Sequence, residues 1–291
     1  MQVRIVTAFH VYMNNLSSRL FTLSRKIRKK LLKEEVFQSY KEALEKCSIK
    51  AYENENVISL VKAKAKAYRE NIAKEKPLKI KPGVIALLEL TKRVHDNGEQ
   101  IIIFDFGGAD GIYYLQLRKC LPPEKRLLWC VIETAEMASE MKEFETSELK
   151  FFTSVRDALS YSGNPPHIFH TSSAVQYTPD PLFFIREICN SGAAYLVFNR
   201  QSITRNDKSI ISIQTSLLSW HGEGDLPKGF VDRVIKYPHT NVPKSEFEKT
   251  ILEKYNVLYT YEDSSGIKTV NKEDIMGLCY VCESKLPGQI V

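Results

Sequence analysis

The chain has 291 residues, of which 43% are hydrophobic and 26% are charged, a composition typical of a globular protein and not of a disordered or fibrous one. This length can hold one large domain and an extension. No apolar run reaches the roughly 20 residues that span a bilayer, which argues against a transmembrane helix. The six cysteines are scattered and lack the spacing of a disulfide framework, so we expect a cytoplasmic protein.

The net charge of +6 is distributed unevenly along the chain. Residues 1–83 hold 19 lysines and arginines against 8 acidic residues, whereas the remainder holds 22 against 27. We therefore divide the chain into a basic helical extension, residues 1–83, and a main domain, residues 84–291. Within the extension, helices are predicted over residues 36–47 and 57–74. A basic segment of this kind favours an anionic partner, or it is simply a solvated helical surface.

A basic amphipathic helix is predicted at the start of the extension, because apolar residues recur at steps of three and four and basic residues fill the positions between them. Two interpretations remain open. The helix can dock on an anionic membrane, which would place the protein peripherally on its inner face. Alternatively, it packs on its own domain or on a second subunit of a homodimer. The apolar positions are Phe9, Met13, Leu16, Leu20, Leu23, Ile27 and Leu31.

The main domain is organised around the apolar run Ile101–Phe106, which leads into a glycine-rich turn. A continuous apolar run bounded by glycines is typical of a strand buried on both faces in a parallel sheet. Ligands bind beyond the carboxyl ends of such strands. The turn lacks the third glycine of a dinucleotide-binding fingerprint, where Ile112 stands, and it lacks the Gly-Lys-Ser/Thr ending of a Walker A loop.

The rest of the main domain alternates predicted helices with predicted strands and closes with two strands. We predict an α/β fold with a Rossmann-like, seven-stranded, mostly parallel sheet, an antiparallel final hairpin and the N-terminal helical extension. The polar stretch 201–242 is interpreted as a loop at the sheet edge that carries substrate-binding groups. Strands are expected at 101–106, 127–132, 149–153, 167–171, 193–198, 257–261 and 277–283, and helices at 84–96, 111–120, 136–145, 181–190 and 245–254.

The alternation of Asp105, Gly107, Ala109 and Gly111 resembles motif I of the class I S-adenosylmethionine-dependent methyltransferases, with Ala109 at the middle glycine. Four segments in order resemble a single bacterial family of predicted methyltransferases, often encoded among surface-polysaccharide biosynthesis genes. The joint order of four motifs is more specific than any one of them. These segments are Phe104–Gly108, Trp129–Thr134, Leu149–Phe152 and Ser172–Tyr177.

The resemblance implies S-adenosylmethionine as the cofactor. Asp105 would then lie beside the methionine ammonium and the sulfonium. Glu133, roughly 20 residues beyond the turn, is placed to accept hydrogen bonds from the ribose hydroxyls, or it is a helix-start glutamate favoured by the macrodipole. The cofactor-binding candidates are Asp105, Gly107, Gly108, Ala109, Gly111, Glu133, Ser154, Val155, Thr171 and Ser172.

Three residues near the strand ends are candidates for acting on the methyl acceptor: His170, Tyr177 and Arg200. A base is needed only if the acceptor is an unactivated hydroxyl or a protonated amine. His170 is either that base or a core histidine, and Tyr177 either faces the acceptor or packs. Arg200 either holds an anionic acceptor or forms a surface salt bridge. His221 and His239, from the polar stretch, are further candidates for the base.

No metal site is expected, because Cys279 and Cys282 form a C-x-x-C without a second pair and a strand would turn their side chains to opposite faces. We expect methyl transfer to a hydroxyl of a small-molecule or glycan acceptor, such as a sugar or a glycolipid-linked sugar. Two alternatives stay open. One is an RNA or protein methyltransferase that uses the basic extension to bind its partner. The other is a cofactor-binding scaffold without turnover.

Overall fold

The central strand of the fold is β2 (Ile101–Phe106), formed by the apolar run that the sequence singles out. It belongs to a computed structural model that describes residues 35–47, 54–72, 74, 79–94, 100–263 and 274–286. Residues 36–291 group into one unit, and the elements below all belong to it. The predicted amphipathic helix at residues 9–31 lies outside the described residues.

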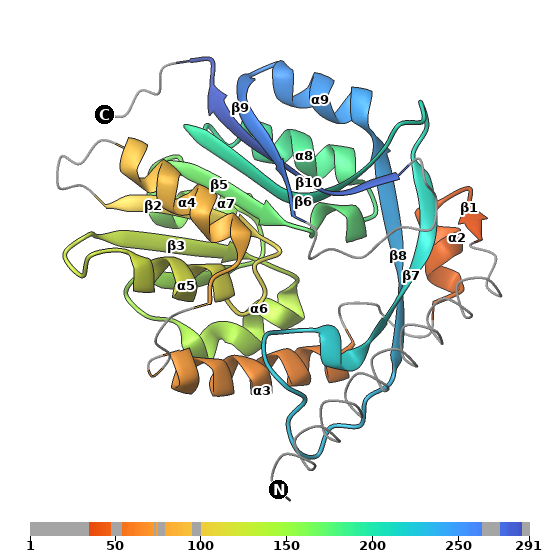
Figure 1. Cartoon of the computed structure of the whole chain (residues 1–291), viewed down its shortest axis with the longest axis horizontal. Helices are drawn as coiled ribbons and strands as arrows, with labels where there is room; N and C mark the ends of the chain where they lie inside the picture. The colour runs from red at the N-terminus through yellow and green to blue at the C-terminus, as the bar shows by residue number, and fades with distance from the viewer. Residues whose placement is uncertain are drawn as a thin grey trace, which may run out of the picture. The chain divides into compact units, whose positions relative to one another are not determined.

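Seven strands form the core of the sheet, in the order β4-β3-β2-β5-β6-β10-β9. The first five run parallel to one another, and β10 is antiparallel to both of its neighbours (Figure 1). The predicted α/β fold, with a mostly parallel sheet and an antiparallel final hairpin, is confirmed, and three strands described below extend the predicted seven strands to ten. The other strands of this core are β3 (Leu127–Ile132), β4 (Leu149–Phe152), β5 (Ile168–Ser172), β6 (Tyr195–Thr204), β9 (Tyr255–Glu262) and β10 (Asp274–Ser284).

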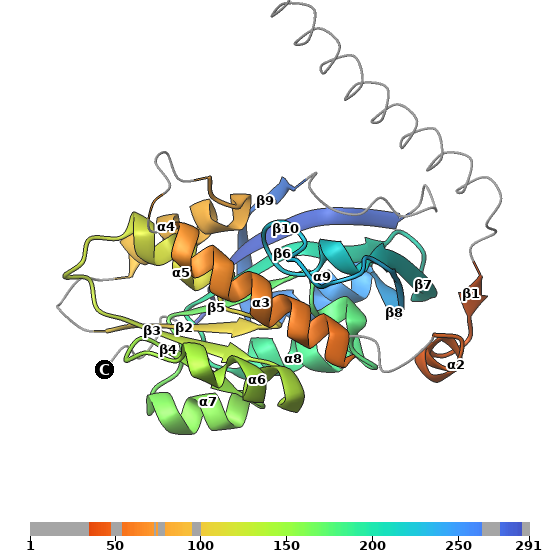
Figure 2. The same ribbon diagram turned by 90° about the horizontal axis from the view of Figure 1, so that it is seen from below.

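Helices cover both faces of this sheet, which explains why the central strands are apolar at every position. Ile101 and Ile103 pack on one side with α3, α4, α5 and α6, whereas Ile102 and Phe104 pack on the other with α7, α8 and α9. Figure 2 shows α4 and α5 on the opposite side of β2 and β3 from α7. The helices are α3 (Glu55–Ile72), α4 (Pro82–Arg93), α5 (Ile112–Cys120), α6 (Ala135–Met141), α7 (Val155–Ser162), α8 (Pro181–Asn190) and α9 (Lys244–Leu252).

The stretch 201–242 is not the loop that the sequence predicts. It forms the antiparallel pair β7 (Ile210–Leu217) and β8 (Val234–Pro243), and the end of β8 runs parallel to the end of β6. The prediction was wrong because polar residues break the apolar alternation in β7 and because β8 contains Pro238, a residue that weakens any strand prediction. The predicted helix at 36–47 is divided into β1 (Val36–Phe37), which pairs with β7, and α2 (Tyr40–Glu45).

Helix α3 belongs to the predicted extension by sequence, yet its apolar face lies in the core of the main domain. Val57, Leu60 and Val61 are buried there, and the buried Lys64 donates its Nζ–H to the carbonyl of Ser219 at 2.6 Å. Residues 36–83 and the main domain therefore share one unit. None of the helices in the described part of the chain is long and apolar enough to cross a bilayer.

Candidate cofactor and acceptor site

The glycine turn, residues 107–111, begins where β2 ends and leads into α5. Gly107 and Gly111 adopt φ angles of 70° and 75°, which glycine reaches without a steric penalty. A Cβ at position 107 would lie 2.2 Å from the Cβ of Ala174, and one at 108 would lie 2.4 Å from the Oδ2 of Asp105. The backbone of this turn is therefore bare by necessity, because side chains at these positions have no room.

Backbone strain in the described residues is concentrated at one edge of the sheet. The non-glycine residues with positive φ are Ala109, Ser173 and Arg200. They follow β2, follow β5 and lie in β6 directly beyond its pairing with the end of β5. Such conformations cost about 1–3 kcal/mol each and cluster at functional sites, so the carboxyl-terminal edge of these three strands is the candidate site.

Asp105 lies beneath the glycine turn and not in front of it. The side chain is 1% exposed, its Oδ2 accepts the indole N–H of Trp129 at 3.2 Å, and its Oδ1 lies 2.8 Å from the Nδ1 of His170. Both oxygens thus bind groups of neighbouring strands. At 1% exposure, this carboxylate would have to be uncovered before it could contact the ammonium or sulfonium of a cofactor, as the sequence predicts.

His170 is the other half of this buried pair. It is 0% exposed, and the ring of Tyr113 covers it at a centroid distance of 4.4 Å. Its Nε2 has no hydrogen-bond partner. Of the two interpretations of His170, a core histidine fits this enclosure better than a base that meets the acceptor.

Glu133 connects the end of β3 to the glycine turn. Its Oε1 accepts the backbone N–H of Ala109 at 3.0 Å, and its Oε2 accepts that of Thr134 at 3.0 Å. Burial raises the pKa of Glu133 to about 7, against the lowering effect of these two hydrogen bonds. A carboxylate has lone pairs beyond these two, so Glu133 can still accept hydrogen bonds from a vicinal diol.

Asp110 is a candidate that the sequence analysis missed. It is 2% exposed, its Oδ2 has no hydrogen-bond partner, and the nearest cation is Nη1 of Arg69 at 4.0 Å. Burial raises its pKa to about 6, and the charge of Arg69 opposes that rise. The signal was available in the sequence, because Asp110 is an acid inside a turn of otherwise small residues.

Arg69 fixes the position of the turn from helix α3. Its Nη2 donates to the carbonyl of Asp110 at 2.6 Å, and its guanidinium lies 4.1 Å from the centre of the Phe144 ring. A planar cation that stacks on an aromatic ring and donates to a carbonyl is well fixed. The sequence placed Arg69 in the extension, so its role in the turn could not be read from the motif.

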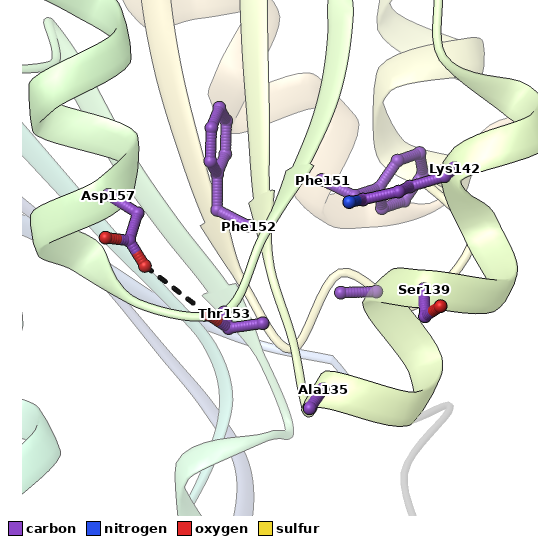
Figure 3. Close-up of a pocket in the computed structure, with 8 residues that line it drawn as sticks. Ala135, Ser139, Lys142, Phe151, Phe152, Thr153 and Asp157 are labelled. Atoms are coloured by element: carbon purple, nitrogen blue, oxygen red, sulfur yellow. Dashed lines mark hydrogen bonds between the residues drawn. The ribbon is translucent and has the colours of Figure 1, made fainter.

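The exit of β4 carries a cavity of about 220 Å³. The side chains of Phe151 and Phe152 point to opposite sides of β4 (Figure 3). Ser154 lies next to this cavity and caps α7, accepting the N–H of Asp157 at 3.1 Å, while Val155 packs in the core. Ser154 and Val155 are both among the predicted cofactor-binding residues. The cavity is lined by Ala135, Ala138, Ser139, Lys142, Phe151, Phe152, Thr153 and Asp157.

Thr171 and Ser172 tie the end of β5 to its neighbours. Thr171 donates its hydroxyl to the carbonyl of Phe106 at 3.0 Å. Ser172 shares a hydrogen bond with the hydroxyl of Tyr113 at 2.9 Å, and Asn199 donates its Nδ2–H to both groups. This network holds α5, β5 and β6 together directly beneath the edge where the strained residues lie.

The structure brings Tyr177 and His239 together, although 62 positions of sequence separate them. Tyr177 lies in the 3₁₀ turn η3 (Val175–Tyr177), and its ring centre is 5.4 Å from that of His239. Its hydroxyl donates to Oε1 of Gln214 at 3.1 Å, and burial raises its pKa. Burial lowers the pKa of His239 to about 4, and its Nε2 has no hydrogen-bond partner.

His221 packs against Tyr237, with the ring centres 5.9 Å apart, and its ring nitrogen Nε2 is already engaged. Its Nε2 shares a hydrogen bond with the Ser216 hydroxyl at 2.9 Å, and burial lowers its pKa to about 4. Cys279 and Cys282 are both buried free thiols. Within the described ranges, His, Cys, Asp and Glu side chains form no group of three or more that could hold a metal ion.

No model of a known protein family matches the sequence, and no curated protein matches it. Solved structures with a similar fold include an S-adenosylmethionine-dependent methyltransferase from Clostridium acetobutylicum ATCC 824, at 13% identity and a TM-score of 0.40, covering 75% of this chain and 98% of that one. Another is the N-terminal domain of EvdMO1 with SAH bound, at 10% identity and 0.44, covering 72% and 83%.

A third similar structure is SAM-bound CalS10, an amino pentose methyltransferase from Micromonospora echinaspora involved in calicheamicin biosynthesis. The identity is 10% and the TM-score 0.43, and the match covers 75% of this chain and 94% of CalS10. Likenesses this weak identify no family. The function of this chain has to be derived from its own strand order and site residues.

Proposed function

We propose that this chain transfers the methyl group of S-adenosylmethionine to a hydroxyl of a small acceptor, such as a sugar or a glycolipid-linked sugar. The observation that carries the proposal is the hydrogen bond from Ala109 to Glu133. It joins a turn of small residues after the first strand, with no room for side chains at positions 107 and 108, to a half-buried carboxylate at the end of the next. This pairing suits a nucleoside that has a diol and no phosphate, since the turn offers no lysine or arginine of its own.

The residues of the turn fit S-adenosylmethionine. Glu133 would bind the ribose hydroxyls, and the cavity at the exit of β4 lies on the side where the adenine would extend. The Oδ2 of Asp110, which has no hydrogen-bond partner and lies 4.0 Å from the Nη1 of Arg69, would accept from the methionine ammonium, the role predicted for Asp105 from the sequence. When bound, the cofactor supplies an activated methyl group on a sulfonium. Asp105 would support the turn from below through Trp129 and His170.

The acceptor would lie over the carboxyl ends of β5 and β6, where Tyr177, His239 and Arg200 gather. These residues would orient the nucleophile and exclude water, which is most of what an in-line methyl transfer needs. His239 is the candidate to accept a proton, because its pKa of about 4 leaves it uncharged at neutral pH and its Nε2 has no hydrogen-bond partner. Since it is 2% exposed, its ring would have to be uncovered as the acceptor binds. A pKa this low makes it a weak base, so an acceptor with an acidic hydroxyl fits best.

The proposal is tested by supplying methyl-labelled S-adenosylmethionine with three pools of acceptor: glycan and glycolipid extracts, RNA, and protein extracts. We expect label in the glycan or small-molecule pool only. Label in RNA or protein would instead support the alternative in which the basic extension recruits a macromolecule. Binding of the cofactor product without transfer into any pool would support a scaffold without turnover.

The N-terminal extension gives this proposal a location. We propose a cytoplasmic enzyme whose basic amphipathic segment docks on the anionic inner face of a membrane, where glycolipid-linked acceptors would be presented. Packing on a second subunit is the alternative. Flotation with anionic liposomes separates them: deletion of residues 1–33 is expected to abolish membrane recovery, and equal recovery of both proteins would refute docking. A change from dimer to monomer in solution after the deletion would support a homodimer.

A further inference from the structure

Arg200 occupies an unusual position in strand β6. Its φ is 51°, and its backbone N–H donates to the Sγ of Cys279 at 3.2 Å in place of a carbonyl of the ladder. The pairing with β10 shifts here, since Gln201 lies opposite Leu278 but Phe198 lies opposite Tyr280. Two residues thus face one, which is a β-bulge, and bulges redirect side chains next to active sites.

The guanidinium that this bulge redirects forms no ion pair with the part of the chain that the structure describes. Arg200 is only partly exposed, its Nε is buried without a hydrogen-bond partner, and it makes no ion pair with any residue in the described ranges. Arginine cannot lose its proton in a protein, so the charge persists. A partly buried and unpaired charge lowers stability, which makes it informative when a strained backbone holds it in place.

The tyrosine hydroxyls whose pKa this charge affects are neutral and belong to the proposed acceptor site. Burial raises the pKa of Tyr113 and of Tyr177, and the positive charge of Arg200 opposes both rises. Tyr113 bridges to Ser172, and Tyr177 contacts His239. The surroundings therefore offer one permanent positive charge among hydroxyl groups.

We propose that Arg200 binds a carboxylate of the methyl acceptor, and hence that the acceptor is a small carboxylic acid such as a sugar acid. The guanidinium fork matches the two oxygens of a carboxylate, and one positive charge balances one negative charge. A phosphate monoester carries more charge than this single cation would balance. The inference rests on the proposed function, because it places the anion beside the methyl donor.

The test uses the full chain saturated with S-adenosylhomocysteine, and simple anions as probes. Sodium benzoate, sodium acetate and inorganic phosphate are titrated against sodium chloride at equal ionic strength, and thermal unfolding gives the apparent affinity. Three variants are compared: Arg200→Gln, Arg200→Lys and the exposed control Arg205→Gln. Thermal unfolding of each variant is first measured without any probe, which shows whether the variant folds.

We expect the two carboxylates to stabilise the wild type and the Arg205→Gln control. In Arg200→Gln the apparent affinity for them should fall by about tenfold or more, since a charge-assisted pair is lost. Arg200→Lys should bind with intermediate affinity. Equal responses of wild type and Arg200→Gln, tighter binding of phosphate than of benzoate, or a large loss of melting temperature in both Arg200 variants would each overturn the proposal.

The same experiment separates this inference from the proposed function. Affinity for S-adenosylhomocysteine is measured by calorimetry in every variant, and Arg200→Gln should leave it unchanged. Suppose that neither the wild type nor any variant binds S-adenosylhomocysteine, and that the carboxylates still stabilise the wild type but not Arg200→Gln. The methyltransferase proposal then fails and the anion site stands. If the cofactor product binds and the carboxylates have no effect, the reverse holds.

Discussion

The backbone N–H of Ala109 donates to the Oε1 of Glu133 at 3.0 Å, which joins the glycine turn after β2 to the end of β3. Ala109 itself has a φ of 47°, so the bond holds a strained residue in place. A side chain from one strand end thus determines the backbone of the next. The cofactor proposal depends on this connection, and it makes Glu133 the first residue to test.

The contribution of Glu133 to the stability of the ligand-free protein should decrease as the pH rises, because burial raises the pKa of Glu133 to about 7. The folded protein then holds this proton more tightly than the unfolded chain does. This contribution is complete below about pH 4 and is lost as the pH rises through 7, by about 3 kcal/mol. In urea unfolding between pH 5 and 8, Glu133→Gln should gain stability relative to the wild type as the pH rises, whereas the exposed control Glu136→Gln should follow the wild type. A wild-type slope in Glu133→Gln would contradict this.

Gly107→Ala should destabilise the protein far more than Gly163→Ala. Both glycines have a φ of 70°, so both substitutions carry the left-handed penalty of about 1 kcal/mol. Only at position 107 does the new Cβ also meet the Cβ of Ala174, at 2.2 Å, whereas position 163 has open space. We expect roughly 1 kcal/mol for Gly163→Ala and about 3 kcal/mol for Gly107→Ala in denaturant unfolding. Equal losses would mean that the turn is not packed against η3.

Asp105→Asn should affect folding before it affects cofactor affinity. The substitution replaces one of the two buried carboxylate oxygens, which contact Trp129 and His170, with an amide NH2 group. Leaving a buried polar group without its hydrogen bond costs about 1–3 kcal/mol. Unfolding followed by tryptophan fluorescence measures the loss, with the exposed Asp207→Asn as the control. A variant of wild-type stability that no longer binds S-adenosylhomocysteine would instead return Asp105 to the cofactor site.

Arg69→Gln should loosen the glycine turn from a distance. The guanidinium donates to the carbonyl of Asp110 at 2.6 Å, and a hydrogen bond to a charged group contributes about 1.5–3 kcal/mol. We expect about tenfold weaker binding of S-adenosylhomocysteine and faster hydrogen exchange over residues 107–111. Lys66→Gln, an exposed change on the same helix, is the control. Unchanged exchange in the turn would show that α3 does not position it.

The sequence was sufficient for those parts of the fold that local patterns encode. The apolar run Ile101–Phe106 identified the central strand, and the order of strands predicted the sheet and its final hairpin. It was insufficient where partners are distant in sequence. No spacing shows that Trp129 and His170 occupy both oxygens of Asp105, or that Arg69 holds Asp110. Strands β7 and β8 were missed because their polar residues and Pro238 hide the alternation.

Calorimetric titration of S-adenosylhomocysteine into the wild type and into Glu133→Ala tests the central claim most directly. We expect one-to-one binding by the wild type and about 100-fold weaker binding by Glu133→Ala, because the ribose would lose its carboxylate and the turn would lose the bond from Ala109. Absence of binding by the wild type, or equal affinity in the two proteins, would contradict the account.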